Sequence, residues 1–309
     1  MIQIDSLHKH YGAVHALDGL TMTVEPGVVF GFLGPNGSGK TTTLRILTGL
    51  ARPTSGRVVV AGVDLASDGR TLSSRIGYLP EEPAFYSWMT PREFIDYLGR
   101  LHGLTSADRS ARTKELLELV NLAEAGKRRI GGFSRGMRQR LGLAAALVHK
   151  PEVLLLDEPI SALDPSGRKE VLDLIERLSG ECTILMSSHI LADVERVCTV
   201  VGIIAAGRMI VQSPREALMD RYAQPVFEAE GEDAASVKRW AGILQHEKWV
   251  TAVSMDGDIL RVTVSDVHLA RTELLASAVA QRVALRRYEE VRPSLEDIFL
   301  RLVNKEAIQ

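Results

Sequence analysis

Cysteine is scarce in this sequence. Of the two cysteines, Cys182 lies in the apolar stretch ECTILM and Cys198 in ERVCTVV. Two such residues do not form the disulfide framework of a small secreted domain, nor a cysteine-based metal site. We therefore expect two reduced, buried thiols in a cytosolic chain.

Long apolar runs are also missing. Runs such as VLLL at 153–156 and VVGIIAA at 200–206 fall far short of the ~18 residues that a membrane-spanning helix needs. The opening residues, MIQIDSLHKHYG, show no apolar stretch after a basic start. We expect neither a signal peptide nor a membrane span, although the chain could still dock on a membrane protein.

The sequence has almost no excess of charge of either sign. Its 37 Lys and Arg against 39 Asp and Glu give a formal net charge of −2, so no basic field is available to attract nucleic acid or anionic lipid. The 309 residues are 45% hydrophobic and 25% charged. These values are typical of a soluble globular protein, and the length suggests about two domains.

The predicted elements follow an α/β pattern. Strands surround one helix in the first part of the chain, and helices dominate from about 83 to 149. Apolar strands at 153–157 and 182–188, typical of a parallel sheet, come next. After Pro214 the order β-α-β-β-α-β predicts a small ferredoxin-like α+β domain. We divide the chain into a domain at 1–220 and a second at 223–309.

A glycine-rich loop gives the first chemical signal. GPNGSGKT at 34–41 fits the phosphate-loop pattern G-x-x-x-x-G-K-[ST] between an apolar strand and a helix. Lys40 is expected to reach the β- and γ-phosphates, and Thr41 to bind Mg²⁺. A glycine-rich turn with an unrelated lysine is the alternative, and a dinucleotide site is disfavoured because G-x-G-x-x-G is absent. The predicted nucleotide contacts are Gly34, Pro35, Asn36, Gly37, Ser38, Gly39, Lys40, Thr41 and Thr42.

A pair of acids completes this phosphate site. Asp157 and Glu158 end the apolar strand VLLLDE. Asp157 is expected to hold Mg²⁺ through water, and Glu158 to polarise the attacking water. The alternative is a strand that simply ends in acidic residues.

Further motifs resemble one family of phosphate-loop proteins. FSRGMRQR, beginning at Phe133, is similar to the signature motif of the ATP-binding subunits of ABC transporters. SALD, 161–164, looks like their D-loop, and His189 follows a strand as their switch histidine does. The resemblance covers about residues 1–220. It implies a phosphate-loop NTPase fold with an ABC-type helical subdomain at about 83–149.

The resemblance also assigns roles to residues outside the phosphate loop. Tyr11 would stack on adenine, His189 would sense the γ-phosphate, and Asp164 would belong to the nucleotide site. Two subunits of the family meet head to tail, so Ser134 and Gly136 would contact the γ-phosphate of the partner's ATP. The alternatives are a core tyrosine, a structural histidine and a serine that only caps its own helix.

Three positions depart from the family pattern. Arg135 replaces the first glycine of the signature motif, and Met137 replaces its glutamine. Glu81 stands in IGYLPEEPAFY, where the family usually has glutamine. A carboxylate can still bind a hard cation, so Glu81 is expected to be both a Mg²⁺ ligand and a catalytic residue. Glu81 and the ending PSLEDIFLRLV resemble an exporter-type subset that includes drug, sodium and other small-solute export ATPases.

The resemblance implies an ATP-hydrolysing subunit that couples dimer closure to solute export by a separate permease. Its expected cofactors are ATP and Mg²⁺. Its expected partners are a second copy or a homologous ATPase subunit and an integral membrane permease, at the cytoplasmic face of the membrane; no nucleic acid is expected. Trp88 would lie where the helical subdomain of this family contacts the permease. The alternative is that Trp88 belongs to the core of that subdomain. The alternatives are a soluble ABC-type switch on nucleic acid or the ribosome, which usually has coiled-coil insertions, and a phosphate-loop kinase.

Overall fold

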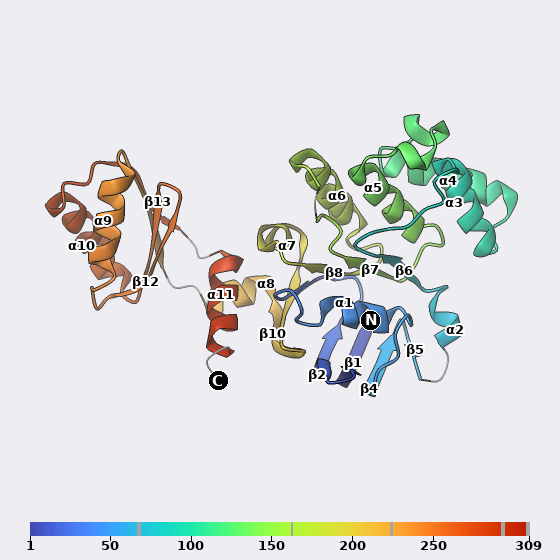
Figure 1. Ribbon diagram of the computed structural model, residues 1–309, viewed down its shortest axis with the longest axis horizontal. Helices are drawn as coiled ribbons and strands as arrows, with labels where there is room; N and C mark the ends of the chain where they lie inside the picture. Colours follow the sequence, from blue (N-terminus) through green and yellow to red (C-terminus); the bar gives the residue numbers. More distant parts are fainter. Residues whose placement is uncertain (67–68, 162, 223–224, 292–293, 307–309) are drawn as a thin grey trace. The chain divides into compact units, whose positions relative to one another are not determined.

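The chain divides into two structural units near residue 215. The computed structural model describes residues 1–309 except 67–68, 162, 223–224, 292–293 and 307–309 (Figure 1). The units are Met1–Arg215 and Glu216–Gln309, whereas the sequence-based division lies at 220–223. Helix α8 (Arg215–Arg221) therefore starts at the division between the units.

The first unit contains a four-stranded antiparallel sheet of order β2-β1-β4-β5. Its strands are β1 (Ile2–Tyr11), β2 (Val14–Val24), β4 (Ser55–Val60) and β5 (Val63–Asp64). β1 is ten residues long and is not regular throughout. An irregularity around Ser6, which has a φ of 45°, shifts the register and lets pairing with β2 continue to Tyr11.

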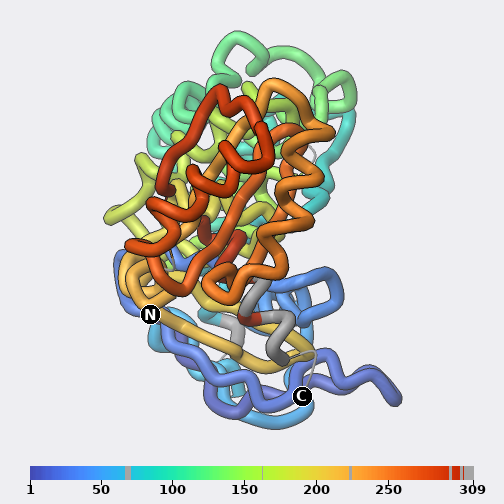
Figure 2. The backbone as a smooth tube through the Cα atoms, turned by 90° about the vertical axis from the view of Figure 1, so that its left-hand side faces the viewer, coloured from blue at the N-terminus to red at the C-terminus, as the bar shows by residue number. Residues whose placement is uncertain are grey.

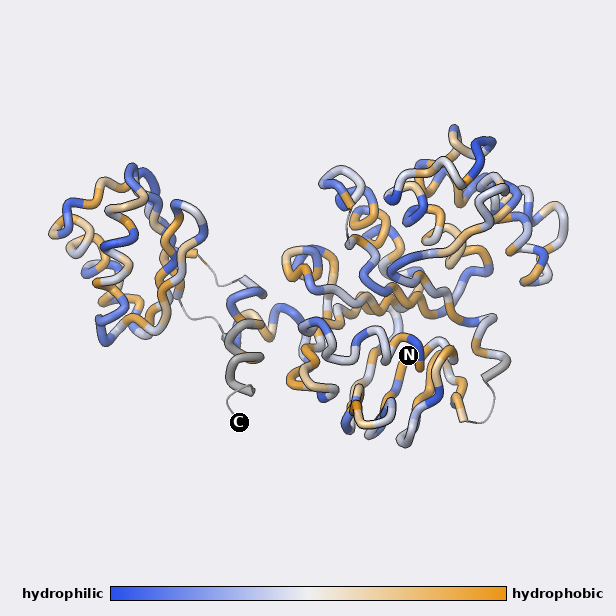
Figure 3. The backbone as a smooth tube through the Cα atoms, in the orientation of Figure 1, coloured by the Kyte–Doolittle hydropathy of each residue, from blue (hydrophilic) through white to orange (hydrophobic). Residues whose placement is uncertain are grey.

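The second sheet of this unit is mainly parallel and has the order β10-β9-β3-β8-β7-β6. Strands β3, β6, β7, β8 and β9 are parallel, and β10 pairs antiparallel with β9. β3, β7 and β8 are buried along their whole length, and Figure 3 shows apolar residues concentrated in these central strands. The bounds are β3 (Val29–Leu33), β6 (Ile76–Leu79), β7 (Val153–Asp157), β8 (Thr183–Ser188), β9 (Val200–Ala205) and β10 (Arg208–Pro214).

Helices cover this sheet and form a separate helical region. Thr90 caps α3 in a capping box: its backbone N–H donates to Glu93 (2.7 Å), and the Glu93 N–H donates to the Thr90 hydroxyl (3.3 Å). The short α7 was not predicted, because seven residues are too few to show a helical period. The bounds are α1 (Lys40–Leu47), α2 (Gly69–Leu72), α3 (Pro91–Leu101), α4 (Ser106–Leu119), α5 (Arg135–Ala146), α6 (Pro165–Leu178) and α7 (Leu191–Val197).

The helical region and the antiparallel sheet lie at opposite ends of the first unit. The helices α3, α4 and α5 are green in Figures 1 and 2, and the strands of the first 60 residues are blue. The parallel sheet lies between them in Figure 1. The carboxyl ends of β3 and β7 lead into the phosphate loop and the acidic pair, respectively.

The second unit has the predicted ferredoxin-like topology. Its elements run β11 (Val226–Gly231), α9 (Ala234–Leu244), β12 (Val250–Asp256), β13 (Ile259–Val264), α10 (Val267–Ala280) and β14 (Leu285–Val291), followed by α11 (Leu295–Glu306). The sheet is antiparallel with the order β12-β13-β11-β14. Its core centres on Trp240, which packs among buried side chains and donates its indole N–H to the Ser277 hydroxyl (3.0 Å).

Both cysteines are free and buried, as the sequence predicted. Burial raises the pKa of Cys182 to about 11 and also raises the pKa of Cys198, so neither thiol is activated. Within the described residues, the structure contains no helix with both the length and the apolar character needed to span a bilayer.

Candidate nucleotide-binding site

Close packing requires glycine in the loop between β3 and α1. A Cβ on Gly34 would lie 2.4 Å from the backbone oxygen of Ile204. Gly39 has a φ of 110°, and a Cβ there would lie 2.7 Å from the backbone oxygen of Ala16. Side chains at either position would clash, so the loop can keep this shape only with glycine. It leads directly into α1, whose N-terminal N–H groups favour an anion.

A pocket of about 270 Å³ opens at this loop. Ten of its lining residues belong to the predicted site, and Ala16 of β2 is the one that sequence reasoning missed. Alanine carries no functional group, so no sequence motif marks it as a site residue. The pocket is lined by Ala16, Asn36, Gly37, Ser38, Gly39, Lys40, Thr41, Thr42, Glu81, Glu158 and His189.

Lys40 is buried at the base of the pocket and is 7% exposed. Its ammonium donates to the backbone oxygens of Gly34 (2.6 Å) and Pro35 (3.3 Å) and lies 3.9 Å from a carboxylate oxygen of Glu158. Burial lowers the pKa of Lys40, and the nearby carboxylates, Glu158 first, oppose this shift. A phosphate group placed here would favour the charged ammonium in the same way.

Asp157 forms a small cluster of oxygen atoms at the end of β7. Its Oδ1 accepts hydrogen bonds from the hydroxyls of Ser187 (2.7 Å) and Thr41 (3.3 Å). A hydroxyl and a carboxylate next to a phosphate loop are the oxygen donors that Mg²⁺ takes together with substrate phosphates. The described residues contain no group of three or more His, Cys, Asp or Glu that could hold a metal ion.

Glu158 is held in a strained position over the loop. Its φ of 47° lies in the left-handed region, which is uncommon for a residue with a Cβ. Its backbone N–H donates to the Ser187 hydroxyl (2.9 Å), so the strain is supported by β8. Strain of this kind clusters at functional sites.

His189 completes a dyad with Glu158. The His189 Nδ1 lies 2.8 Å from Oε2 of Glu158, while the other carboxylate oxygen faces Lys40. The Glu158 side chain is 9% exposed and that of His189 is 51% exposed. The carboxylate is therefore held on two sides, and the imidazole remains open to a ligand.

Ser134, Gly136 and Asp164 are among the predicted site residues that do not line this pocket. Ser134 caps α5 by accepting the Met137 N–H (3.2 Å) and is exposed. Gly136 follows in the first turn, and a Cβ there would be no closer than 3.7 Å to another residue. Asp164 caps α6 by accepting the Gly167 N–H (3.3 Å). Ala162, within the predicted D-loop, lies outside the described residues.

Two aromatic side chains lie on the surface and not in the core. Tyr11, 48% exposed, ends β1, and the Lys9 ammonium lies 4.6 Å from the centre of its ring. Trp88 is 63% exposed and lies 5.0 Å, centre to centre, from the ring of Tyr86. The alternatives that placed these residues in a core are therefore wrong.

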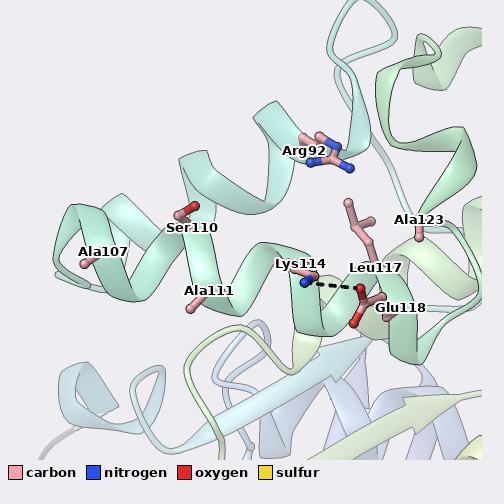
Figure 4. A pocket seen from close by; sticks show the side chains of 8 residues that line it. All are labelled: Arg92, Ala107, Ser110, Ala111, Lys114, Leu117, Glu118 and Ala123. Carbon is pink, nitrogen blue, oxygen red and sulfur yellow. Dashed lines mark ion pairs between the residues drawn. The ribbon is translucent and has the colours of Figure 1, made fainter.

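A larger pocket, of about 640 Å³, lies in the helical region (Figure 4). It has no glycine-rich loop and none of the predicted site residues. Its polar groups include Arg92 and a Lys114–Glu118 pair at 4.0 Å. The other lining residues are Ala107, Ser110, Ala111, Leu117 and Ala123.

The fold and the loop pocket define a phosphate-loop NTPase. Comparison with known protein families matches residues 17–161 to the ABC transporter family, and residues 214–303 to the C-terminal domain of DrrA1-3-like ATP-binding proteins. The chain therefore belongs to the ABC transporter ATP-binding proteins, as its motifs suggested. It is an ATP-binding and ATP-hydrolysing subunit of a membrane transporter.

Individual relatives extend over nearly the whole chain. The uncharacterized ABC transporter ATP-binding protein YxlF of Bacillus subtilis (strain 168) is 41% identical, over 98% of this chain and 100% of its own length. The daunorubicin resistance ATP-binding protein DrrA3 of Streptomyces coeruleorubidus is 36% identical, over 97% of this chain and 95% of its own. These relatives support a transporter subunit and not the soluble switch considered as an alternative.

Solved structures support the fold. The ATP-binding cassette MJ0796, in a dimeric post-hydrolysis state bound to ADP and Pi, has a TM-score of 0.64 and 22% identity, and the match covers 69% of this chain and 98% of that one. The phosphate-loop fold and the helical region predicted from the sequence are therefore confirmed.

Proposed function

We propose that the chain binds the triphosphate of ATP in the loop 34–41 and hydrolyses it with Glu158 and His189. The observation that carries this assignment is the meeting of Lys40, Glu158 and His189 in one pocket beside the loop. Lys40 neutralises the β- and γ-phosphates, and the loop N–H groups cradle them. Mg²⁺ bound by Thr41 and Asp157, with Glu81 beside them, would neutralise further phosphate charge.

Glu158 orients the water that attacks the γ-phosphate. Its backbone is fixed by Ser187, and its carboxylate lies between Lys40 and His189. A carboxylate held in this way can accept a hydrogen bond from water and take its proton. His189 holds the carboxylate through Nδ1 and is exposed enough to meet the γ-phosphate with its other nitrogen. Catalysis is then positioning and charge stabilisation, without a covalent intermediate.

The active form is a head-to-tail dimer with a second copy or a homologous ATPase subunit. Ser134, Gly136 and Asp164 do not line the pocket of their own chain, while the exposed N-terminus of α5 favours an anion. In this arrangement Ser134 and Gly136 meet the γ-phosphate of the partner's ATP. The dimeric state of the MJ0796 cassette supports this assembly.

The permease docks on the helical region. Trp88 and Leu101 are 63% and 65% exposed, and Tyr86 lies beside Trp88. Exposed apolar groups gathered on one region are typical of protein–protein contacts. The chain then acts peripherally at the cytoplasmic face of the membrane. The drug-resistance names of relatives such as DrrA3 support export of a small organic solute.

Nucleotide binding by purified variants tests the central assignment. Lys40→Ala is expected to abolish binding of a fluorescent ATP analogue at concentrations that saturate the parent chain. Lys127→Ala removes the same charge from an exposed position in the 3₁₀ helix Glu124–Lys127 and is the matched control. Unchanged binding by Lys40→Ala, with its fold intact by circular dichroism, would remove the loop from the nucleotide site.

A further inference from the structure

Arg135 is a positively charged residue at the N-terminus of a helix, where a cation is unfavourable. It is the first residue of α5, directly after Ser134. A helix N-terminus carries a partial positive charge that favours anions and disfavours cations. The first turn of α5 contains no acidic residue that would offset Arg135, and the family pattern has glycine here. An anion from outside the helix would offset this unfavourable placement.

Among the described residues, the ion pair of Arg135 is a weak one. Its Nη2 lies 3.8 Å from Oε1 of Glu82, and the two side chains are 47% and 84% exposed. By contrast, Arg138 donates to the backbone oxygen of Phe133 (2.8 Å). Water and salt screen a long, exposed ion pair effectively. The guanidinium of Arg135 is therefore available to a stronger anion.

A pocket of about 290 Å³ beside Arg135 contains an unsatisfied donor. Gln139 of α5 lines this pocket, is 4% exposed, and its amide nitrogen has no hydrogen-bond partner within the described structure. A buried amide N–H group without an acceptor indicates an incomplete polar site. The pocket is lined by Glu81, Glu82, Pro83, Arg135, Arg138 and Gln139.

Two consecutive glutamates link this pocket to the nucleotide pocket. Glu81 lines both pockets, and Glu82 pairs with Arg135. Glu81, which lines the nucleotide pocket of its own chain, is therefore the direct neighbour in sequence of Glu82, the carboxylate that pairs with Arg135.

We propose that Arg135 binds the terminal phosphate of the ATP held by the partner subunit, and that Glu82 holds the same guanidinium when this nucleotide is absent. The inference rests on the proposed function, in which Ser134 meets the partner's ATP. Arginine offers paired donors that match phosphate oxygens, and a γ-phosphate carries more charge than one carboxylate. ADP lacks this group, so Arg135 distinguishes ATP from ADP.

A covalently linked pair of full-length chains tests the proposal without depending on free dimerisation. Both copies carry Glu158→Gln to stop hydrolysis. The first copy also carries Lys40→Ala, so that one phosphate loop, in the second copy, still binds nucleotide. Arg135→Ala is placed either in the first copy, across from the remaining loop, or in the second copy. Equilibrium dialysis then measures the affinity for ATP and for ADP.

We expect the two placements to differ. Arg135→Ala in the first copy should weaken ATP binding roughly tenfold or more, the scale of a lost charge-assisted contact, and leave ADP binding within about twofold. The same substitution in the second copy should leave both affinities within about twofold. Arg135→Lys in the first copy, which keeps the charge but loses the paired donors, should give an intermediate loss for ATP.

Glu82→Gln should change ATP affinity in the opposite direction to Arg135→Ala, and this change should depend on the presence of Arg135. In the first copy it removes the competing carboxylate, so ATP should bind about two- to threefold more tightly. This gain should disappear when Arg135→Ala is also present, because Glu82 acts through Arg135. A gain that persists in the double variant would overturn the role of Glu82.

Several outcomes separate this inference from the proposed function. Equal losses from both placements of Arg135→Ala, or no loss from the first, would overturn the contact with the partner's phosphate while leaving the phosphate-loop assignment intact. An equal loss of ATP and ADP binding would remove the contact with the terminal phosphate. A linked parent that binds no ATP at all would overturn the proposed function itself.

Discussion

Replacing Glu158 with glutamine separates ATP binding from hydrolysis. The substitution keeps the size of the side chain. It also keeps an oxygen that can face the His189 Nδ1 atom, which lies 2.8 Å from Oε2 of Glu158 in the parent chain. It removes the proton acceptor and also a negative charge 3.9 Å from the Lys40 ammonium. We therefore expect the pocket to keep its shape and to lose its base.

The size of the effect follows from what is removed. General-base catalysis contributes about 10²–10⁴-fold to rates, so steady ATP hydrolysis should fall by at least about 100-fold. ATP affinity should stay the same or increase, because a carboxylate that repels the triphosphate is gone. Slow hydrolysis with intact binding should trap the ATP-bound dimer.

Two assays measure the rate of ATP hydrolysis and the formation of the trapped dimer. Phosphate release measures turnover, and size-exclusion chromatography with ATP detects the trapped dimer. Glu152→Gln is the matched control: Glu152 precedes β7, is exposed, and pairs with Arg75 at 3.6 Å. This control should hydrolyse ATP at the parental rate.

The outcome that refutes the reasoning is turnover by Glu158→Gln at the rate of the parent. In that case Glu158 would not be the base, and its strained backbone would need another explanation. Loss of ATP binding together with turnover would instead show that the carboxylate shapes the pocket, contrary to its proposed role.

Three further predictions concern the chain outside Glu158. Truncation after Tyr222 should leave ATP affinity nearly unchanged in a fluorescence titration; a tenfold loss, ~1.4 kcal/mol, would mean that the second unit shapes the site. In a linked pair, Lys40→Ala in one copy and Ser134→Arg in the other should leave one composite site intact and retain at most about half of the hydrolysis, if the sites act independently. Both lesions in one copy should leave none, and the reverse result would exclude contact of Ser134 with the partner's ATP. Gly34→Ala should lower stability by about 1–3 kcal/mol, because its Cβ would lie 2.4 Å from Ile204 O; Gly242→Ala, with open space around its Cβ, should not lower the melting temperature.

Local chemistry made the phosphate loop and its two flanking elements predictable. The glycines of 34–41 have a steric reason, and the run VLLLDE marks a buried strand with acids at its end. The β-α-β-β-α-β order of the second unit followed from hydrophobic periodicity, which is also local. The roles of Ser134, Gly136 and Asp164 came from the family resemblance and stay predictions, because they concern a second chain.

The sequence by itself determined which groups could handle a phosphate: Lys40 in its loop, Asp157 and Glu158 after their strand. Only the tertiary structure decided that His189 meets Glu158, that Glu81 lines the pocket, and that Ala16 closes it. The contact of His189 with Glu158 depends on β8 and β7 lying side by side, Glu81 follows the neighbouring strand β6, and Ala16 comes from β2 of the other sheet. The hydrophobic patterns of buried parallel strands are nearly alike, so the choice of neighbours comes from the packing of the whole sheet and not from any one segment.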